Sequence, residues 1–462
     1  MAWKPSAAVI AGSLIALAAC GGSAPSSAPA SVAASAPALS SAPATTQPLA
    51  SKPAAASPAA AASGGPVKVG LIEALTGPFA ELGKDNQDGF NLYLASISGA
   101  VAGRKIEPVI VDSQAQPDTA LTKAKQLVEN DKVQVLMGMH GTPECYALAG
   151  YAKQAQVPMI VSGNCGAQTL TTDPKFASPY LARLTQTTTV LTDPAADWAY
   201  KQGYRKAIVI VLNYGGGLEA LDAFASAFVQ RGGSIVQELT PDLGTPDFGP
   251  VLAQLDPKAD FLYVFTPGTD ALRLGQQYGN YSGQQSRPFI DGTGQITSGP
   301  NGAQLKDKTT GFVGVSFYTE AIPGPQNEAF LKAFRAKYPD RPVSTDVVQG
   351  WTGAQFLAAA LQKVNGAIEN KQAFLEALDN AQVETPKGPV ALDKTHDVIE
   401  NMYTYRLEKG ANGVAPKLLE TYKQVSSTWD RTPQELERLP LGKLKGKWVG
   451  MTKDQLAKLT QG

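Results

Sequence analysis

The feature that most constrains this chain is the stretch VKVGLIEALTGPFAELG, in which an apolar run is broken by a Gly-Pro turn. Val67–Ile72 is rich in β-branched residues, which predicts a buried strand. Between Ala80 and Ile97 the apolar residues recur at helical spacing, which predicts a helix. Together they form the first half of a βαβ unit. In sheets built from such units, ligands bind beyond the carboxyl ends of strands, so we expect Thr76–Phe79 to form one wall of a ligand cleft.

The segment before this strand has the composition of a targeting signal followed by a spacer. Residues 1–20 carry a lone lysine, a short apolar stretch and small residues before Cys20, which predicts a secretory signal peptide. The ending LAACGG resembles a bacterial lipobox, and this resemblance implies an exported lipoprotein, lipid-anchored through Cys20 to the outer face of a membrane. A soluble secreted protein is the alternative. Residues 21–65, mostly Ala, Ser and Pro, cannot bury enough apolar surface to order themselves and are expected to form a tether.

Composition excludes several classes of protein. About 400 residues follow the tether, which favours two lobes over a single core. The chain has 40 Lys and Arg against 40 Asp and Glu, so no basic surface indicates a nucleic-acid partner. The only histidines are His140 and His396, neither at ligand spacing, so we predict no metal site and no cofactor.

Two further cysteines, Cys145 and Cys165, each follow one of two successive predicted strands. Oxidation is permitted in an exported protein, so we expect a disulfide between them, with two independent buried thiols as the alternative. A bridge closing a loop of this size would stabilise the fold by about 3 kcal/mol.

Predicted strands and helices alternate along most of the chain, which indicates parallel, doubly wound sheets. The strands expected in two successive series are Ile106–Asp112, Val133–Gly138, Val157–Val161, Ala207–Leu212, Ser234–Leu239 and Asp260–Phe265, with late strands at Val390–Leu392 and Met402–Leu407. Among the expected helices are Cys145–Gln154, Pro194–Gln202 and Ala271–Tyr278. From Ser426 onward we find no reliable periodicity.

The order of these segments resembles the periplasmic binding proteins of the leucine/isoleucine/valine type, the substrate receptors of ABC importers. The similarity lies in VGLIEALTGPFAELG, GRKIEPVIVDSQAQPDTALTKAKQLVENDKVQVLMG, VPMIVSG, IVLNYGGGLEALDAF, TPDFGPVLAQL, DFLYVFTPGTDALRLGQQ and GPVALD. It implies an α/β fold of two doubly wound parallel-sheet lobes that are joined by a three-strand hinge and close over a ligand. Residues 66–187 and 317–395 would form lobe 1. Residues 188–316 and 396–462 would form lobe 2, with a C-terminal extension.

The resemblance also implies a set of ligand-binding residues. They are Thr76, Phe79, His140, Gly141, Thr142, Asn164, Cys165, Gly166, Tyr214, Asp270 and Asp291. Three of them have equally simple structural roles: Thr142 and Asp270 as helix N-caps, and Phe79 in core packing. As a ligand residue, Asp270 would pair with an ammonium group.

The expected ligand is a small carboxylate-bearing solute. Amino-acid-binding members of the family hold the ligand carboxylate with paired Ser/Thr hydroxyls and backbone N–H groups, and here Thr142 keeps one hydroxyl while Asn164 offers an amide. We therefore expect a branched-chain or other apolar amino acid, with an aromatic acid or a small amide as the alternative.

Two other classes of function were considered. An enzyme is disfavoured, because Gly215-Gly216-Gly217 lacks a phosphate-binding or dinucleotide motif and because Cys145, five residues after His140, is expected in the disulfide. A sensor that partners a membrane signalling protein is the second alternative. We predict instead a monomer that closes over its ligand and delivers it to an ABC permease.

Overall fold

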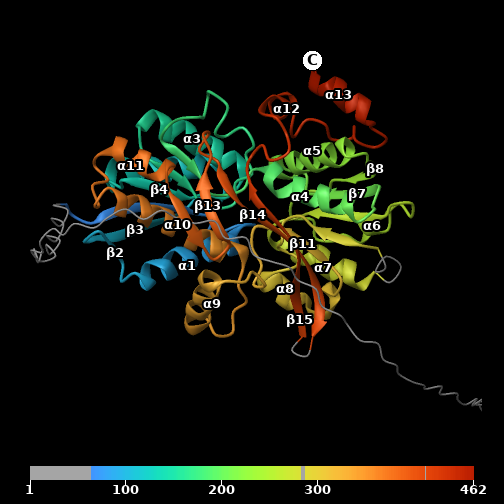
Figure 1. The fold of residues 1–462 in the computed structure, drawn as a ribbon, viewed down its shortest axis with the longest axis horizontal. Helices are drawn as coiled ribbons and strands as arrows, with labels where there is room; N and C mark the ends of the chain where they lie inside the picture. The colour runs from blue at the N-terminus through green and yellow to red at the C-terminus, as the bar shows by residue number, and fades with distance from the viewer. Residues whose placement is uncertain (1–63, 282–286, 411–412, 462) are drawn as a thin grey trace, which may run out of the picture. The chain divides into compact units, whose positions relative to one another are not determined.

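Two mixed sheets, each with a parallel central part, and their flanking helices make up the described part of the chain (Figure 1). The structure, a computed structural model, describes residues 64–281, 287–410 and 413–461, which belong to one compact unit. The predicted signal peptide, Cys20 and most of the predicted tether lie outside these residues. No helix within the described ranges is long and apolar enough to cross a membrane.

The first sheet forms around β1 (Val67–Glu73), the strand predicted from the opening apolar run. Its strand order is β2-β3-β1-β4-β5-β6, with β2 antiparallel to β3 and the other pairs parallel. The other strands are β2 (Ala100–Val101), β3 (Arg104–Asp112), β4 (Val135–Gly138), β5 (Met159–Val161) and β6 (Leu181–Arg183). With helices α1–α3, α10 and α11 this sheet forms the first lobe.

The second sheet repeats that topology around β7 (Lys206–Val211). Its order is β12-β13-β14-β11-β10-β9-β7-β8, so β8-β7-β9-β10-β11 follows the same pattern as β3-β1-β4-β5-β6. The remaining strands are β8 (Ser234–Leu239), β9 (Phe261–Phe265), β10 (Phe289–Asp291), β11 (Val313–Ser316), β12 (Gln382–Thr385), β13 (Gly388–Leu392), β14 (Val398–Gly410) and β15 (Gly413–Val425). With helices α4–α8 it forms the second lobe. The predicted fold of two α/β lobes is confirmed.

The helices lie close to the predicted positions but several begin earlier. They are α1 (Ala80–Ser96), α2 (Pro117–Lys125), α3 (Thr142–Ala155), α4 (Thr188–Lys201), α5 (Gly215–Gln230), α6 (Gly249–Leu252), α7 (Gly268–Asn280), α8 (Gly299–Leu305), α9 (Pro325–Lys337), α10 (Thr345–Lys363), α11 (Lys371–Asp379), α12 (Pro433–Arg438) and α13 (Lys453–Gln461). The expected start of α4 at Pro194 is wrong, because the Thr187 side chain accepts the Val190 N–H at 3.1 Å and caps the helix earlier.

The chain passes between the lobes after β6, after β11 and before β14. Strand β14 is shared: its first residues, Val398 and Ile399, pair with β13, and Tyr403–Arg406 pairs with β11. Next to it, Arg183 at the end of β6 forms a β-bridge with Asp397. These crossings run side by side, as the predicted hinge requires, whereas the residue boundaries predicted for the lobes stay predictions.

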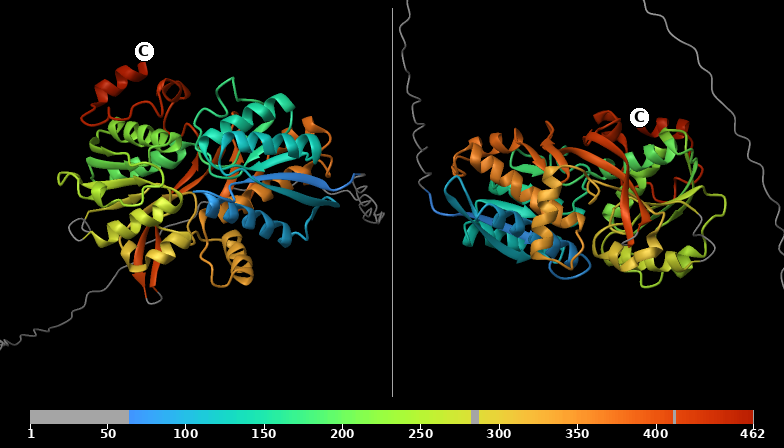
Figure 2. Two further views of the ribbon diagram at one scale, coloured as in Figure 1. Left: turned by 180° about the vertical axis from the view of Figure 1, so that it is seen from behind. Right: turned by 60° about the horizontal axis from the view of Figure 1, so that its bottom comes forward.

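The C-terminal segment is more ordered than its sequence suggests. Figures 1 and 2 show α12 and α13 over α5 and β8 of the second lobe, and α13 contacts α5. Trp448 is fully buried, and its indole N–H donates to Asp222 Oδ1 at 2.6 Å. The next residue, Val449, pairs in parallel with Ile235 of β8, so the segment covers the outer edge of the second sheet.

Helices α1 and α10 cross at a contact that only glycine permits. A Cβ on Gly89 would lie 1.9 Å from the Val347 carbonyl oxygen, and a Cβ on Gly350 would lie 1.9 Å from the Asn86 carbonyl oxygen. Backbone therefore packs against backbone at this crossing. Since Leu82 of α1 and Thr345 of α10 both line the cavity described below, the contact helps to hold these two residues in its wall.

We expect Gly350→Ala to lower the free energy of unfolding by about 1–3 kcal/mol or more, because the added methyl group must push two helices apart. The matched control is Gly150→Ala, in α3, where a Cβ would meet nothing within 4 Å. That change should raise the free energy of unfolding by about 0.5–1 kcal/mol, since alanine restricts the unfolded chain. Urea titrations of both variants measure the difference, and equal effects would contradict this account of the crossing.

Candidate ligand-binding site

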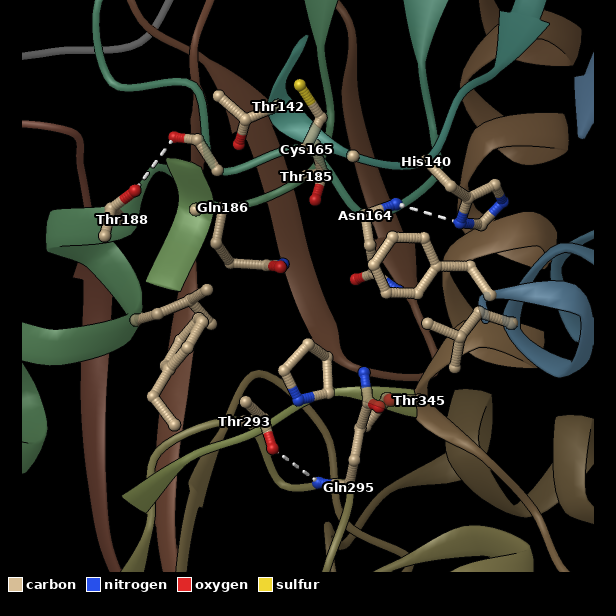
Figure 3. A pocket seen from close by; sticks show the side chains of 18 of the residues that line it. His140, Thr142, Asn164, Cys165, Thr185, Gln186, Thr188, Thr293, Gln295 and Thr345 are labelled. Atoms are coloured by element: carbon tan, nitrogen blue, oxygen red, sulfur yellow. Dashed lines mark hydrogen bonds between the residues drawn. The ribbon is translucent and has the colours of Figure 1, made fainter. Parts of the chain in front are cut away.

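A cavity lies between the two lobes, where the carboxyl ends of the strands in both sheets face each other (Figure 3). It encloses about 720 Å³ of empty space, its open mouth included. Loops after β1, β4, β5 and β6 form one side, and loops after β7, β9, β10 and β11 form the other. Its lining residues are Phe79, Leu82, His140, Gly141, Thr142, Asn164, Cys165, Gly166, Thr185, Gln186, Thr188, Leu191, Tyr214, Gly216, Phe265, Pro267, Thr293, Gln295, Phe317 and Thr345.

Most of the predicted binding residues line this cavity. The structure brings together Phe79, His140, Gly141, Thr142, Asn164, Cys165, Gly166 and Tyr214. Thr142 is the first residue of α3 and not its N-cap, which is Gly141 with φ at 96°. No helix-capping bond therefore occupies the Thr142 hydroxyl, which is left beside the cavity.

Three predicted residues lie outside the cavity. Thr76 is exposed, and its hydroxyl donates to Asp112 Oδ2 at 2.7 Å, which ties the β1 loop to the end of β3. Asp270 is neither the N-cap of α7, which is Pro267, nor a cavity residue. Its carboxylate accepts the Gly244 N–H at 2.7 Å and Arg273 Nη1 at 2.9 Å. The ammonium contact expected of Asp270 is therefore not supported.

Asp291 acts one layer behind the cavity wall. Its buried carboxylate accepts the backbone N–H groups of Ile296 at 2.8 Å and Thr297 at 2.9 Å, and the Thr293 hydroxyl at 2.8 Å. Burial raises its pKa, while these hydrogen bonds oppose the shift. By accepting these hydrogen bonds, Asp291 holds the loop after β10 and positions Thr293 and Gln295, which line the cavity.

Sequence reasoning missed more than half of the lining residues. Thr185, Gln186 and Thr188 follow β6, a strand of only three residues that carried no periodic signal. Phe317 follows β11, and Thr345 begins α10, so both arrive from chain segments far from the first βα units. The rule that ligands bind beyond strand ends would have found the residues after β6, had that strand been recognised.

At one end of the cavity the N-termini of α3, α4 and α5 meet. A Cβ on Gly216 would lie 3.3 Å from Thr142 Oγ1 and 3.2 Å from Tyr214 Oη, which places these hydroxyls close together. A Cβ on Gly166 would lie 2.9 Å from Thr188 Oγ1. Helix N-termini present unsatisfied N–H groups and partial positive charge, so this end suits an anion.

The two loops from β4 and β5 are joined covalently. Cys145 of α3 and Cys165 form a disulfide with their Cα atoms 6.4 Å apart. In addition, the Gly141 N–H donates to the Asn164 carbonyl oxygen at 2.7 Å. The first-lobe half of the wall is therefore fixed before any ligand arrives. The bridge also occupies the thiol that an enzyme using Cys145 as nucleophile would need.

Comparison with known proteins agrees with this architecture. The family model for periplasmic binding proteins matches residues 66–412. The chain belongs to this family. It is thus a type I periplasmic binding protein, an extracytoplasmic solute receptor of an ABC transporter, and its family is one of receptors and not of enzymes.

Three similar proteins illustrate the relationship. The "Leu/Ile/Val-binding protein homolog 6" of Brucella melitensis is 29% identical over 352 residues, which cover 75% of this chain and 89% of that protein. An ABC transporter substrate-binding protein from Sphaerobacter thermophilus is 32% identical with a TM-score of 0.74, covering 78% of this chain and 98% of that one. A solute-binding protein from Rhodopseudomonas palustris BisB5, solved with 3,4-dihydroxybenzoic acid, is 30% identical with a TM-score of 0.72, covering 77% and 97%.

Behind the first-lobe wall this binding protein buries a histidine–carboxylate pair. His140 Nε2 lies 2.6 Å from Glu73 Oε2, and both side chains are almost fully buried. His140 Nδ1 accepts the Asn164 N–H at 3.4 Å (Figure 3), so the ring proton sits on Nε2, the nitrogen that faces Glu73. Burial lowers the pKa of His140 to about 4 and raises that of Glu73 well above its usual value. The ring is therefore neutral at pH 7.

Two further buried acids lie near this pair. Asp346 accepts the Asn164 side-chain amide, and burial raises its pKa to about 7. Glu144, in the first turn of α3, is fully buried, and its burial, followed in smaller measure by the nearby Glu73 carboxylate, raises its pKa to about 8. At neutral pH the folded protein therefore keeps Glu144 protonated.

We expect Glu144→Gln to stabilise the binding protein increasingly as the pH rises. The pKa of Glu144 is raised in the folded state, so between about 4.5 and 8 the folded chain holds a proton that the unfolded chain releases, and wild-type stability falls over that range. Glutamine cannot ionise, so the advantage of the variant should reach a few kcal/mol near pH 8 and then level off.

Urea unfolding of both proteins at pH 5, 7 and 8.5 measures this advantage, with the exposed Glu328→Gln as the control that changes little at any pH. An advantage of Glu144→Gln that stays constant with pH would contradict the assignment.

Proposed function

We propose that the cavity binds a small aromatic carboxylate and that the protein delivers it to an ABC importer. One observation carries this proposal: among the described residues that line the cavity, none is Asp, Glu, Lys or Arg. A ligand ammonium group in a desolvated cavity is held most strongly by a carboxylate, and no carboxylate of the described residues lines this one. A carboxylate, by contrast, finds helix N-termini and hydroxyls at one end of the same cavity.

The apolar part of the wall supports a flat, unsaturated ligand body. Phe79, Leu82, Leu191, Phe265 and Phe317 contribute to the lining, and aromatic rings pack well against one another in edge-on or offset contacts. The R. palustris relative, which holds 3,4-dihydroxybenzoic acid, adds support from a chain that is 30% identical.

A branched-chain amino acid is the second candidate. The names of the curated relatives favour it, and so does Glu219, whose Oε2 accepts the Thr188 hydroxyl at 3.2 Å just behind the wall. An ionised Glu219 would attract an ammonium group through that hydroxyl. Burial raises the pKa of Glu219, however, and its carboxylate does not line the cavity, so we propose the aromatic acid in place of the amino acid expected from the sequence.

The proposed mechanism is lobe closure. Loops of both lobes contribute to the cavity, so a ligand that touches both favours the closed state by its contacts there. Closure removes water and strengthens the polar contacts to the ligand. We also propose that lipidation of Cys20, outside the described residues, holds the receptor near its importer.

We expect benzoate or a hydroxybenzoate to raise the melting temperature of the purified protein, because a ligand of the folded state stabilises it by mass action. Calorimetry should then show that Thr142→Val weakens this binding at least about tenfold, since a hydrogen bond to a charged group contributes about 1.5–3 kcal/mol. The control is Thr122→Val, an exposed threonine on α2.

The outcome that would overturn the proposal is stabilisation by leucine, isoleucine or valine without any effect of the ring acids. If Thr142→Val bound the ring acids with unchanged affinity, the proposed ligand class would be kept, but the Thr142 hydroxyl would no longer be assigned as a ligand contact.

A further inference from the structure

Gln186 reaches the cavity from the segment that crosses between the lobes. Its side chain is almost fully buried, lines the cavity and extends toward the middle of it (Figure 3). Its amide nitrogen donates to Glu400 Oε1, on the shared strand β14. Because a carboxylate oxygen accepts hydrogen bonds, the amide nitrogen is committed to Glu400 and the amide oxygen is the group left for a ligand.

A buried ion pair fixes that orientation. Lys387 Nζ lies 2.5 Å from Glu400 Oε2, and both side chains are fully buried. Lys387 Nζ also donates to Gln349 Oε1 at 2.6 Å. If the proton shared by the pair moved from Nζ to Oε2, Oε1 would still be an acceptor. Gln186 therefore keeps its oxygen free in either case.

We propose that the Gln186 side-chain oxygen recognises a hydrogen-bond donor on the ligand, a ring hydroxyl in the aromatic case, and that Lys387 and Glu400 position it. This inference rests on the proposed function and deepens it, because it narrows the ligand from aromatic acids in general to hydroxylated ones. Glu400 and Lys387 are positioning residues, whereas Gln186 contacts the ligand itself.

A second amide side chain, on the opposite wall, is also held with its nitrogen bonded to a carboxylate and its oxygen left for a ligand. Asn164 donates its side-chain N–H to Asp346, and Figure 3 shows Asn164 and Gln186 directed toward each other across the cavity. Gln295 is turned the other way: its oxygen accepts the Gly268 N–H at 2.7 Å, so its NH₂ group is the one left for a ligand. Two amide oxygens in mid-cavity disfavour a carboxylate there and direct it to the helix N-termini.

The expected consequence is discrimination by a single hydroxyl group. A site built to accept a hydrogen bond rejects the analogue that lacks the donor, because its own buried acceptor then stays unpaired. Fluorine has nearly the size of a hydroxyl but donates nothing. We therefore expect at least one of 3- and 4-hydroxybenzoate to bind at least tenfold more tightly than the fluorobenzoate with the same substitution position.

The experiment is calorimetry of the purified protein with the hydroxy- and fluorobenzoate pairs and with leucine. In Gln186→Met, which keeps the side-chain length, the hydroxy/fluoro ratio should fall to about threefold or less. The double variant Lys387→Met/Glu400→Gln should lower the ratio as well, because it frees the Gln186 amide to rotate. The matched control is Lys409→Met/Asp307→Asn, which removes an exposed ion pair of 2.5 Å.

A role of these residues in folding alone would change stability or all affinities together, but not the ratio. Equal affinities for both members of each pair in the wild type would overturn this inference and leave the proposed function in place. An unchanged ratio in Gln186→Met, or in the double variant if Gln186→Met does not fold, would overturn it as well. Binding of leucine with no binding of any ring acid would overturn the proposed function and this inference together.

Discussion

The structure depends on how buried charges are paired where the chain crosses between the lobes. Arg183, at the end of β6, places its guanidinium 2.6 Å from Asp397, just before β14, and three residues later Glu400 meets Lys387. Each pair lies between segments distant in sequence, and each side chain is fully buried. Removing one member would leave a charge without compensation, which is far more costly than losing an exposed ion pair. The crossing strands are therefore held in one alignment. This alignment also positions the loops that form the cavity.

The residues that align the crossing strands also contact several of the loops that form the site. Arg183 also donates to the Ala167 carbonyl oxygen at 2.5 Å, directly after the loop that brings Asn164–Gly166 to the cavity. Glu400 holds Gln186, and Lys387 lies 4.8 Å from the ring centre of Phe317, which lines the wall. Residues that touch the cavity thus contact the hinge itself. In the proposed closure mechanism, movement of the lobes would therefore act on the ligand through direct contacts.

The sequence was sufficient for the fold and for eight of the twenty described residues that line the cavity. Short β-branched runs followed by Gly-rich turns predict βα units, and the residues after those strands, from Phe79 to Tyr214, reach the cavity as expected. Asp270 and Asp291 do not line the cavity, for a physical reason: a carboxylate at a strand end or helix start can equally well accept backbone N–H groups, and only the three-dimensional course of the loops decides. Thr345 could not be found, because its place depends on how α10 packs against α1.

The covered edge of the second sheet limits how copies of the chain can associate. An edge strand such as β8 exposes unpaired N–H and C=O groups, which can pair with another chain. Here the Gly450 N–H donates to the Ile235 carbonyl oxygen at 3.2 Å, and Glu238 of the same strand accepts the N–H groups of Gly446 and Trp448. The chain thus occupies with its own C-terminal segment an edge to which copies of itself would otherwise add. A second molecule could pair with this part of β8 only after the C-terminal segment had detached from it.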